Sequence, residues 1–598
     1  MSQLQSINQL LEKLQAPTQS VANLSFCDSS RDGVAKWVQS LPLTQIQFVG
    51  GILYKALPEI SWLQTSAANR INILEILRAP TTQIIEGLSK HFLNQPLILP
   101  EDAIKMATIA QALQKHLNNG YMVTIRDLCK ESNPKKHLLA LSLHRAMMGM
   151  GLLLFRYYQL YLPVPAKLWS DVNSLYQLAA NFNLLDEVVP ETLAHHQNCN
   201  TIKLAYTRIL LLACCRANQL RQMEITAIYD ALNTLTHLAK IHEDDGKNTE
   251  DNLLSVAPLS NEAPNYRSRI KELGHAFILV LNTKNIIKRL EELNHKTPDD
   301  TGENTTRVNE LKLSPALTQH LIQAWDLLPL RNLDRQPTAG TLNVTVGISS
   351  IHYHLAGKTH FFDFLDSAHR PQMNRGIESL FQNRALQSQQ KNGSNEWIDP
   401  LDELDTPPDS KEAQDASEPH PIYEVPLIDT SPGGYCLEWR DEIPNQVKAG
   451  ELLGLLDPVR NYWSLGVVRW ANLTQGATQL GIQILAPHAT PVGVALVSKS
   501  GEISEFLRAL EIPATSSLNQ PATLITNTVS FREQSKVRMY HRATQVEANK
   551  GDDNIQLISR CFATGVFNQF TFQYLTPPAP KEPQPSEKPL LFDPEWDA

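Results

Sequence analysis

Apolar residues recur with helical spacing along the first half of the chain. Four of them stand at i, i+3, i+4 and i+7, the spacing of one helix face: Val34, Trp37, Val38 and Leu41. Comparable sets run from Met106 to Leu117 and from Trp169 to Phe182. We therefore expect an all-helical array over residues 1–245.

Helical periodicity resumes after a polar stretch from Glu243 to Pro264. We expect a long helix from about Tyr266 to Leu293 and a connector helix over Leu313–Leu328, which together occupy residues 265–330.

Proline spacing and internal similarity bear on how the array is organised. Pro42, Pro58, Pro80 and Pro100 recur at short intervals, which predicts short helices that return on one another. The segment Leu168–Leu185 faintly resembles one half of a tetratricopeptide repeat, but no second clean copy follows at a fixed period. Both a helical repeat and an irregular helical domain are compatible with this pattern.

The pattern changes to alternation after residue 331. Leu342, Val344 and Val346 alternate with polar residues, which is the period of a half-buried strand. Other candidate strands are Tyr435–Trp439, Trp463–Trp470, Gly481–Leu485, Val492–Val497 and a set within 522–575. Many short strands favour a barrel or sandwich. We expect one β-domain over 331–500 and a further β-rich module over 501–575.

Two segments are predicted to lie outside this packed structure. An insertion over about 357–424 contains the acidic, proline-bearing stretch Glu396–Pro419, whose composition is typical of a solvated segment. The proline-rich tail 576–598 ends with Leu590, Phe592 and Trp596, which could fold back or bind a partner.

Composition narrows the class of protein. The net charge of −9 argues against a broadly basic nucleic-acid binder but allows a local arginine patch for one small anion. The 7 cysteines form no CxxC pair, which fits a reducing compartment. The N-terminus lacks the basic start and apolar core of a signal peptide. The longest apolar stretch, Ala146–Phe155, is about half of the roughly 20 residues that a bilayer requires. We therefore expect a cytoplasmic protein without a membrane span.

Sequence motifs point to binding rather than to catalysis. No GxxxxGK[ST], GxSxG, HExxH or GxGxxG motif occurs, so we expect no enzyme, no cofactor and no metal. His352 and His354 would share one strand face, which fits a metal site or, more simply, a packed polar strand.

Two separated motifs carry the functional hypothesis. Arg331 and Arg335 form RxxxR just after the connector helix, and DTSPGG places Asp429, Ser431, Gly433 and Gly434 between apolar strands. Together they resemble the two signatures of the PilZ domain family, RxxxR and [D/N]xSxxG, which bind cyclic di-GMP in that family. The later strands from Trp463 to Leu485 are also similar to strands of that barrel. Here, unlike in the family, a long insertion separates the two motifs.

The residue types suit the ligand that this resemblance implies. Arginine can bind phosphate oxygens with paired charge-assisted hydrogen bonds, or donate to guanine O6 and N7. Asp429 can accept from the guanine ring N–H and amino group, and Ser431 offers a hydroxyl. Gly433 and Gly434 permit positive φ and a close approach of the backbone to an anion.

The sequence thus predicts a multidomain α+β protein: a helical array, a PilZ-like β-barrel with a long insertion, and a β-rich C-terminal module. The resemblance implies a bacterial cyclic di-GMP receptor that couples nucleotide binding to a protein partner, through the helical array or the tail, in motility, surface attachment or biofilm control. A nucleotide-independent PilZ-like scaffold is the main alternative. An enzyme with its site in the helical half is a weaker one.

Overall fold

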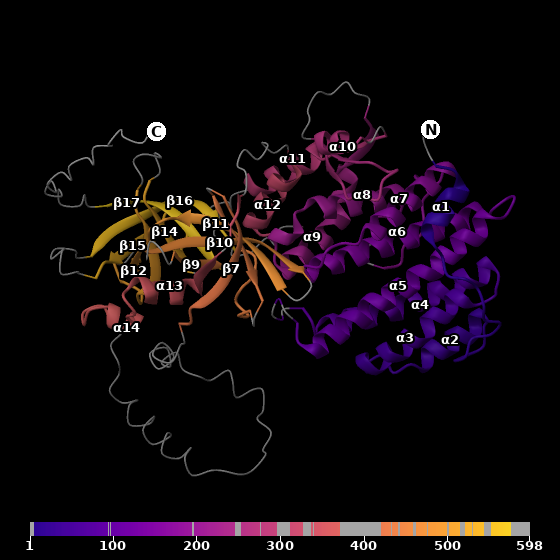
Figure 1. The fold of residues 1–598 in the computed structure, drawn as a ribbon, viewed down its shortest axis with the longest axis horizontal. Coiled ribbons are helices and arrows are strands. Elements are labelled where there is room, and N and C mark those ends of the chain that lie inside the picture. The colour runs from indigo at the N-terminus through magenta and orange to yellow at the C-terminus, as the bar shows by residue number, and fades with distance from the viewer. Residues whose placement is uncertain are drawn as a thin grey trace, which may run out of the picture. The chain divides into compact units, whose positions relative to one another are not determined.

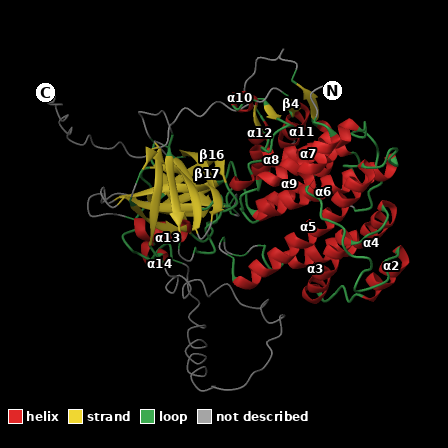
Figure 2. Ribbon diagram, turned by 45° about the vertical axis from the view of Figure 1, so that its right-hand side comes forward, coloured by secondary structure: helices red, strands yellow, loops and turns green. Residues whose placement is uncertain are grey.

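Long α-helices build the first part of the computed structural model (Figures 1 and 2). In chain order they are α1 (Ile7–Leu14), α2 (Arg31–Ser40), α3 (Ile46–Trp62), α4 (Ala67–Ser89), α5 (Glu101–Cys129), α6 (Lys136–Gln159), α7 (Ala166–Asn181), α8 (Ile202–Cys214) and α9 (Gln222–Leu235). Their lengths range from 8 to 29 residues, so no unit of fixed length repeats among them. The expected helical array is confirmed.

The description covers residues 5–93, 95, 97, 99–193, 197–244, 253–274, 277–295, 311–326, 336–338, 340–370, 420–431, 433–440, 443–457, 462–474, 477–498, 501–514, 521–528, 530–542 and 552–575. The chain divides into two compact units. The first comprises residues 1–342, 424–451 and 466–484, and the second comprises 343–423, 452–465 and 485–598.

Side-chain caps explain several helix starts, while two prolines behave differently from expectation. The Ser30 and Ser66 side chains accept hydrogen bonds from backbone N–H groups in the first turns of α2 and α4. Pro58 and Pro80 were expected to end helices, but they lie inside α3 and α4. Both helices bury an apolar face, and this packing offsets the hydrogen bond that an internal proline removes.

A small sheet interrupts the helices and corrects two expectations. Its strand order is β1-β4-β2-β3, with β1 (Lys240–Glu243), β2 (Leu254–Val256), β3 (Asn265–Tyr266) and β4 (Leu279–Asn282). The region before residue 330 is therefore not all helical. The long helix expected from Tyr266 to Leu293 is instead two helices, α10 (Arg267–Glu272) and α11 (Lys284–His295), on either side of β4. Gly274, at φ +80°, adopts the left-handed conformation that ends α10.

The connector helix and a closed barrel follow. The connector helix expected over Leu313–Leu328 corresponds to α12 (Pro315–Trp325), and residues 327 and 328 lie outside the described residues. The strands of the middle barrel are β6 (Thr341–Val346), β7 (Tyr423–Ser431), β8 (Gly434–Trp439), β9 (Leu452–Asp457), β10 (Tyr462–Thr474) and β11 (Ala477–Ala486). The order β7-β6-β9-β10-β11-β8 closes because β8 also pairs with β7, and β5 (Gln336–Pro337) joins outside β7. The predicted β-barrel is confirmed.

The insertion between β6 and β7 begins with helix. His352 and His354 were expected to share one face of a strand, but they lie in a helix, α13 (Gly347–Leu355). A second short helix, α14 (Phe361–Phe364), follows. Among the described residues no group of three or more His, Cys, Asp or Glu side chains could hold a metal ion.

A second closed barrel forms the C-terminal part. Its strands are β12 (Thr490–Leu496), β13 (Leu507–Ile512), β14 (Thr523–Asn527), β15 (Lys536–Tyr540), β16 (Asp553–Ala563) and β17 (Phe567–Tyr574), in the order β12-β13-β14-β17-β16-β15. The strand expected over Val492–Val497 was assigned to the middle barrel. It is instead β12, the first strand of the C-terminal one, because alternation marks a strand but not the barrel in which it pairs.

Helix α6 is the one described helix that is long and apolar enough to cross a membrane by length and composition. Most of its apolar window is buried inside the protein, as in the core helix of a folded domain.

Candidate functional site

The DTSPGG motif forms a β-hairpin in the first unit. Asp429 and Ser431 lie at the end of β7, Gly434 begins β8, and Ser431 is paired directly with Gly434. Asp429 and Ser431 are half-buried, while Gly433 in the connection is exposed. The hairpin therefore gathers all four predicted residues of this motif within one turn of chain.

A register shift lies immediately before the acidic residue. Leu427 pairs with Leu437, but Asp429 already pairs with Cys436, so β7 has one extra residue between these pairs. Such bulges bend a strand and re-aim the side chain that follows. Asp429 and Ser431 are two residues apart in the regular strand after this shift, so their side chains lie on one face of the end of β7.

The RxxxR motif lies directly before a strand that pairs with this hairpin. Arg331 and Arg335 themselves are outside the described residues. The next two residues form β5, in which Gln336 pairs with Thr430 and Pro337 pairs with Asp429. β5 is the edge strand of the sheet, which is the position where a strand tolerates proline.

A pair of threonines near this strand was missed at the sequence level. The Thr338 Oγ1 and Thr430 Oγ1 atoms are 3.0 Å apart, and the Thr338 N–H donates to the Ile428 carbonyl at 3.1 Å. These contacts hold the chain that follows RxxxR against β7. Pro337 was the available signal, because a proline between a polar motif and a strand pattern suggests an edge strand.

Gly434 is required for a reason other than the expected one. The sequence allowed Gly434 a positive φ, but it is absent from the described residues with positive φ. A Cβ atom at this position would lie 1.9 Å from the Ile482 backbone oxygen of β11, which no side chain can tolerate. A Cβ on Gly433 would meet nothing within 4 Å. The two glycines therefore differ: one allows close strand packing, and the other leaves open space at the hairpin.

The strands beside the hairpin are bonded to the helical part of the same unit. The Leu473 N–H on β10 donates to the Tyr161 carbonyl, just after α6, at 2.9 Å. The Arg221 guanidinium, just before α9, donates to the Ala449 carbonyl at 3.1 Å. These bonds connect the barrel strands of the first unit to two helix ends.

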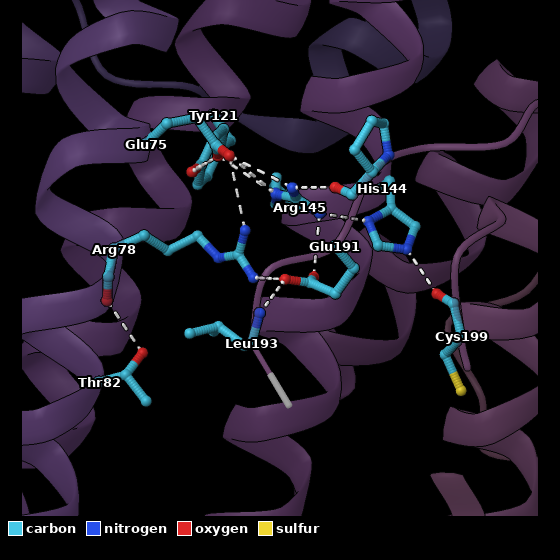
Figure 3. Close-up of polar contacts among 10 residues, drawn as sticks. Glu75, Arg78, Thr82, Tyr121, His144, Arg145, Glu191, Leu193 and Cys199 are labelled. Carbon is cyan, nitrogen blue, oxygen red and sulfur yellow. Dashed lines mark hydrogen bonds and ion pairs between the residues drawn. The ribbon is translucent and has the colours of Figure 1, made fainter. Parts of the chain in front are cut away.

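The helical part also contains a buried polar cluster, which Figure 3 shows in close-up. Arg145 pairs with Glu75 at 3.2 Å and with Glu191 at 3.0 Å, and Arg78 also pairs with Glu191. Tyr121 donates its hydroxyl hydrogen to Glu75 at 2.6 Å. Burial alone would raise the pKa of Glu191, but the two arginines outweigh it and lower that pKa.

His144 completes the cluster in its neutral form. Its Nε2 atom lies 2.6 Å from the Cys199 carbonyl oxygen, and its Nδ1 atom lies 3.0 Å from Arg145. Burial lowers the pKa of His144 to about 4. The charges of the cluster satisfy one another, and their contacts join α4, α5 and α6 to the segment that carries Glu191.

The middle barrel and its hairpin, with RxxxR ahead of it, are the parts of a PilZ-domain protein. Comparison with known families agrees: the profile of the middle PilZ domain of the cyclic-di-GMP receptor FimW matches residues 253–491. Profiles of the FimW N-terminal domain and of the FimW C-terminal β-barrel domain match residues 32–246 and 492–575.

One relative matches along almost the whole length of the chain. It is the cyclic-di-GMP receptor FimW of Pseudomonas aeruginosa (strain PAO1), which is 32% identical over 593 residues, 96% of this chain and 95% of the relative. The chain belongs to the FimW family. No solved structure matches it.

Proposed function

We propose that this protein is a cyclic di-GMP receptor that holds the nucleotide with Arg331, Arg335, Asp429, Ser431 and the two glycines of the hairpin. The pairing of β5 with β7 carries the proposal. Gln336, the residue bonded to Arg335, pairs with Thr430, and consecutive Cα atoms are only about 3.8 Å apart. The two motifs are far apart in sequence, yet the chain tethers one to the other.

Strand geometry supports a common face for the motif residues. Pro337 is paired with Asp429, and directly paired residues point to the same side of a sheet. In an extended chain the side chain two residues earlier points the same way. Asp429 and Ser431 therefore share this side of the sheet with Pro337, which is the second residue after Arg335 along the chain.

The chemistry of the motif residues suits a nucleotide with two phosphodiesters and two guanines. The guanidinium groups supply donors for phosphate oxygens or for guanine O6 and N7. Asp429 supplies an acceptor for the guanine N–H groups. The open space at Gly433 allows a base or phosphate to approach the backbone. The FimW relative, by its name, binds the same nucleotide.

The output of this cytoplasmic receptor would be a protein partner, bound through the helical array or through the tail at 576–598. Motility, surface attachment or biofilm control is the expected setting. The bonds Leu473–Tyr161 and Arg221–Ala449 support this coupling, because they connect strands beside the hairpin to helix ends. Small-angle scattering and limited proteolysis near residue 331, with and without nucleotide, test it. Unchanged profiles in both measurements would contradict a conformational output.

Calorimetric titration of the full-length protein with cyclic di-GMP tests the binding itself, with GTP and cyclic di-AMP as controls. Arg335→Ala should weaken binding roughly tenfold to a hundredfold, because a hydrogen bond to a charged group contributes about 1.5–3 kcal/mol. Arg440→Ala is the matched control: Arg440 is exposed at the end of β8 and pairs with Glu438. If the wild-type protein binds no nucleotide, the scaffold alternative holds. If Arg335→Ala binds like the wild type, the site is elsewhere.

A further inference from the structure

A cavity of about 300 Å³ lies within the helical part, far along the chain from the nucleotide motifs. Its walls come from α4, α5, α6 and α9, and from the segments after α4 and before α8. The apolar side chains of the wall are Ile85, Leu93, Ala110, Leu152, Leu153, Phe155, Leu193 and Tyr229. At about 30 Å³ for each water in the liquid, the space equals about ten waters. Cavities of this size hold small organic ligands.

Arg156 supplies a buried positive charge to this wall. The residue is 8% exposed, and its guanidinium lies 4.8 Å from the centre of the Phe92 ring. It donates one hydrogen bond, at 2.8 Å, to the side-chain oxygen of Gln159. Burial lowers the pKa of Arg156 to about 10, so the group remains charged at neutral pH.

The polar cluster of Figure 3 provides the contrast within the same unit. Arg145 has two carboxylates and a carbonyl oxygen as acceptors, and Arg78 pairs with the same two carboxylates. Throughout the described part of the chain, no carboxylate pairs with Arg156. A guanidinium has five N–H donors, and a buried cation without a counter-charge is costly. Arg156 therefore lacks the anion that its neighbours have.

A second hydrogen-bond donor of the wall also lacks an acceptor. The side-chain nitrogen of Gln111, on α5, lines the cavity and is buried without a hydrogen-bond partner. The Gln159 oxygen is already occupied by Arg156, and its nitrogen donates to Thr226 at 2.9 Å. The interior thus has spare donors on two helices. A carboxylate, which only accepts, would satisfy both.

The remaining charges limit the ligand to one negative group. Glu86 and Asp230 also line the cavity, and both are exposed. A second negative charge on the ligand would find no second Lys or Arg in the lining and would meet the Glu86 carboxylate, whereas an apolar body would pack on the leucine and phenylalanine side chains. The lining therefore selects a monoanion with an apolar body.

We propose that this cavity is a binding site for a small carboxylic acid with an apolar chain or ring, whose carboxylate pairs with Arg156 and accepts from Gln111. This site is distinct from the nucleotide site, and the proposal does not depend on nucleotide binding.

Octanoate is the probe, with 1-octanol as its neutral counterpart, and both are titrated into the full-length protein by calorimetry and followed by thermal unfolding. Octanoate should bind the wild-type protein and raise its Tm, while octanol should bind at least about tenfold more weakly, because it lacks the charge-assisted hydrogen bonds. Arg156→Met keeps the bulk of the side chain and removes the charge, so octanoate affinity should fall by at least about tenfold.

Two controls keep the result interpretable. Removing an unpaired buried charge should leave the Tm of unliganded Arg156→Met unchanged or higher, so lost binding would not reflect unfolding. Leu153→Trp keeps Arg156 but fills the cavity, and it should abolish octanoate binding as well. Equal octanoate affinity in the wild type and Arg156→Met would overturn the proposal. So would the absence of both heat and Tm shift with millimolar octanoate in the wild type.

Discussion

The two β-barrels of this protein have the same number of strands. The middle barrel differs by an added edge strand, a glycine at a close strand contact and a long insertion. The C-terminal barrel has an apolar interior: ten buried side chains from Val492 to Phe570 form one core cluster. The middle barrel has an extra edge strand, β5. It also has Gly434 on β8, where the backbone of β11 leaves no room for a side chain. Its insertion, between β6 and β7, separates the two binding motifs.

This difference teaches where binding can evolve on a barrel. A filled interior stabilises the fold but offers no polar surface to a ligand. An edge strand beside a glycine-containing hairpin presents side chains and backbone at the rim without opening the core. We therefore expect the C-terminal barrel to contribute to stability and the middle barrel to bind the nucleotide. Four measurements test this difference between the two barrels.

The largest effect is expected from Phe570→Ala in the C-terminal barrel. Phe570 is 1% exposed, and removing a buried phenylalanine costs about 3–5 kcal/mol of unfolding free energy. Hydrogen exchange should accelerate in β14, β16 and β17, while cyclic di-GMP affinity stays unchanged. Phe572→Ala, on the same strand but only partly buried, should have a smaller effect. A change in nucleotide affinity would contradict this difference between the two barrels.

The hairpin glycines should separate stability from binding. Gly434→Val must push β8 away from the Ile482 oxygen, which we expect to cost about 3 kcal/mol, the upper end of the usual range for overpacking. Gly433→Val has free space, so the Tm should stay within a few degrees of the wild type while nucleotide affinity falls. Hydrogen exchange of β8 and β11, measured beside calorimetry, distinguishes the two. Equal Tm losses would show that the hairpin packs differently.

Acid should weaken the C-terminal barrel through His352 on α13. Burial lowers the pKa of His352 to about 3, against about 6.5 in the unfolded chain. Between these values the unfolded state binds more protons, so stability falls as the pH drops. By pH 5 the loss relative to neutral pH should be about 2 kcal/mol.

Urea unfolding from pH 7 to pH 5 measures this effect. His352→Phe should keep the ring contacts with Phe361 and Phe364 and should flatten that part of the pH dependence. The same slope in the variant would assign the titration to another group.

The smallest effect is expected from Ser431→Ala. The serine hydroxyl donates to the Gly434 carbonyl at a long 3.4 Å, so its loss should hardly change the Tm. Losing one neutral hydrogen bond to the nucleotide costs about 0.5–1.5 kcal/mol, or roughly twofold to tenfold in Kd. Unchanged Kd would remove Ser431 from the site.

Periodicity predicted the elements that bury one face over several turns or residues. The sets at Val34, Met106 and Trp169 became α2, α5 and α7, and the alternation at Leu342 became β6. Each has a stripe of apolar residues that only one secondary structure can bury.

The failures have tertiary causes. Pro58 and Pro80 were tolerated because their helices are packed into the core, which local propensity cannot register. The strands β1 to β4 have only two to four residues each, too few for a period to emerge. For the site, the sequence indicated the hairpin residues by motif. It could not indicate that Gly434 faces the Ile482 oxygen or that Thr338 meets Thr430, because those contacts depend on strand pairing across distant segments.

The hydrogen bond from Leu473 to the Tyr161 carbonyl has a thermodynamic consequence. Tyr161 stands two residues after Gln159, at the end of the helix that carries Arg156, and β10 neighbours β11, which pairs with the hairpin strand β8. If this bond couples the two sites, the coupling free energy is the same whichever ligand binds first, because linkage is reciprocal. If an acid in the helical cavity tightened nucleotide binding tenfold, the nucleotide would tighten binding of the acid tenfold. Titrating each ligand in the presence of the other would therefore give two independent measurements of the same coupling free energy.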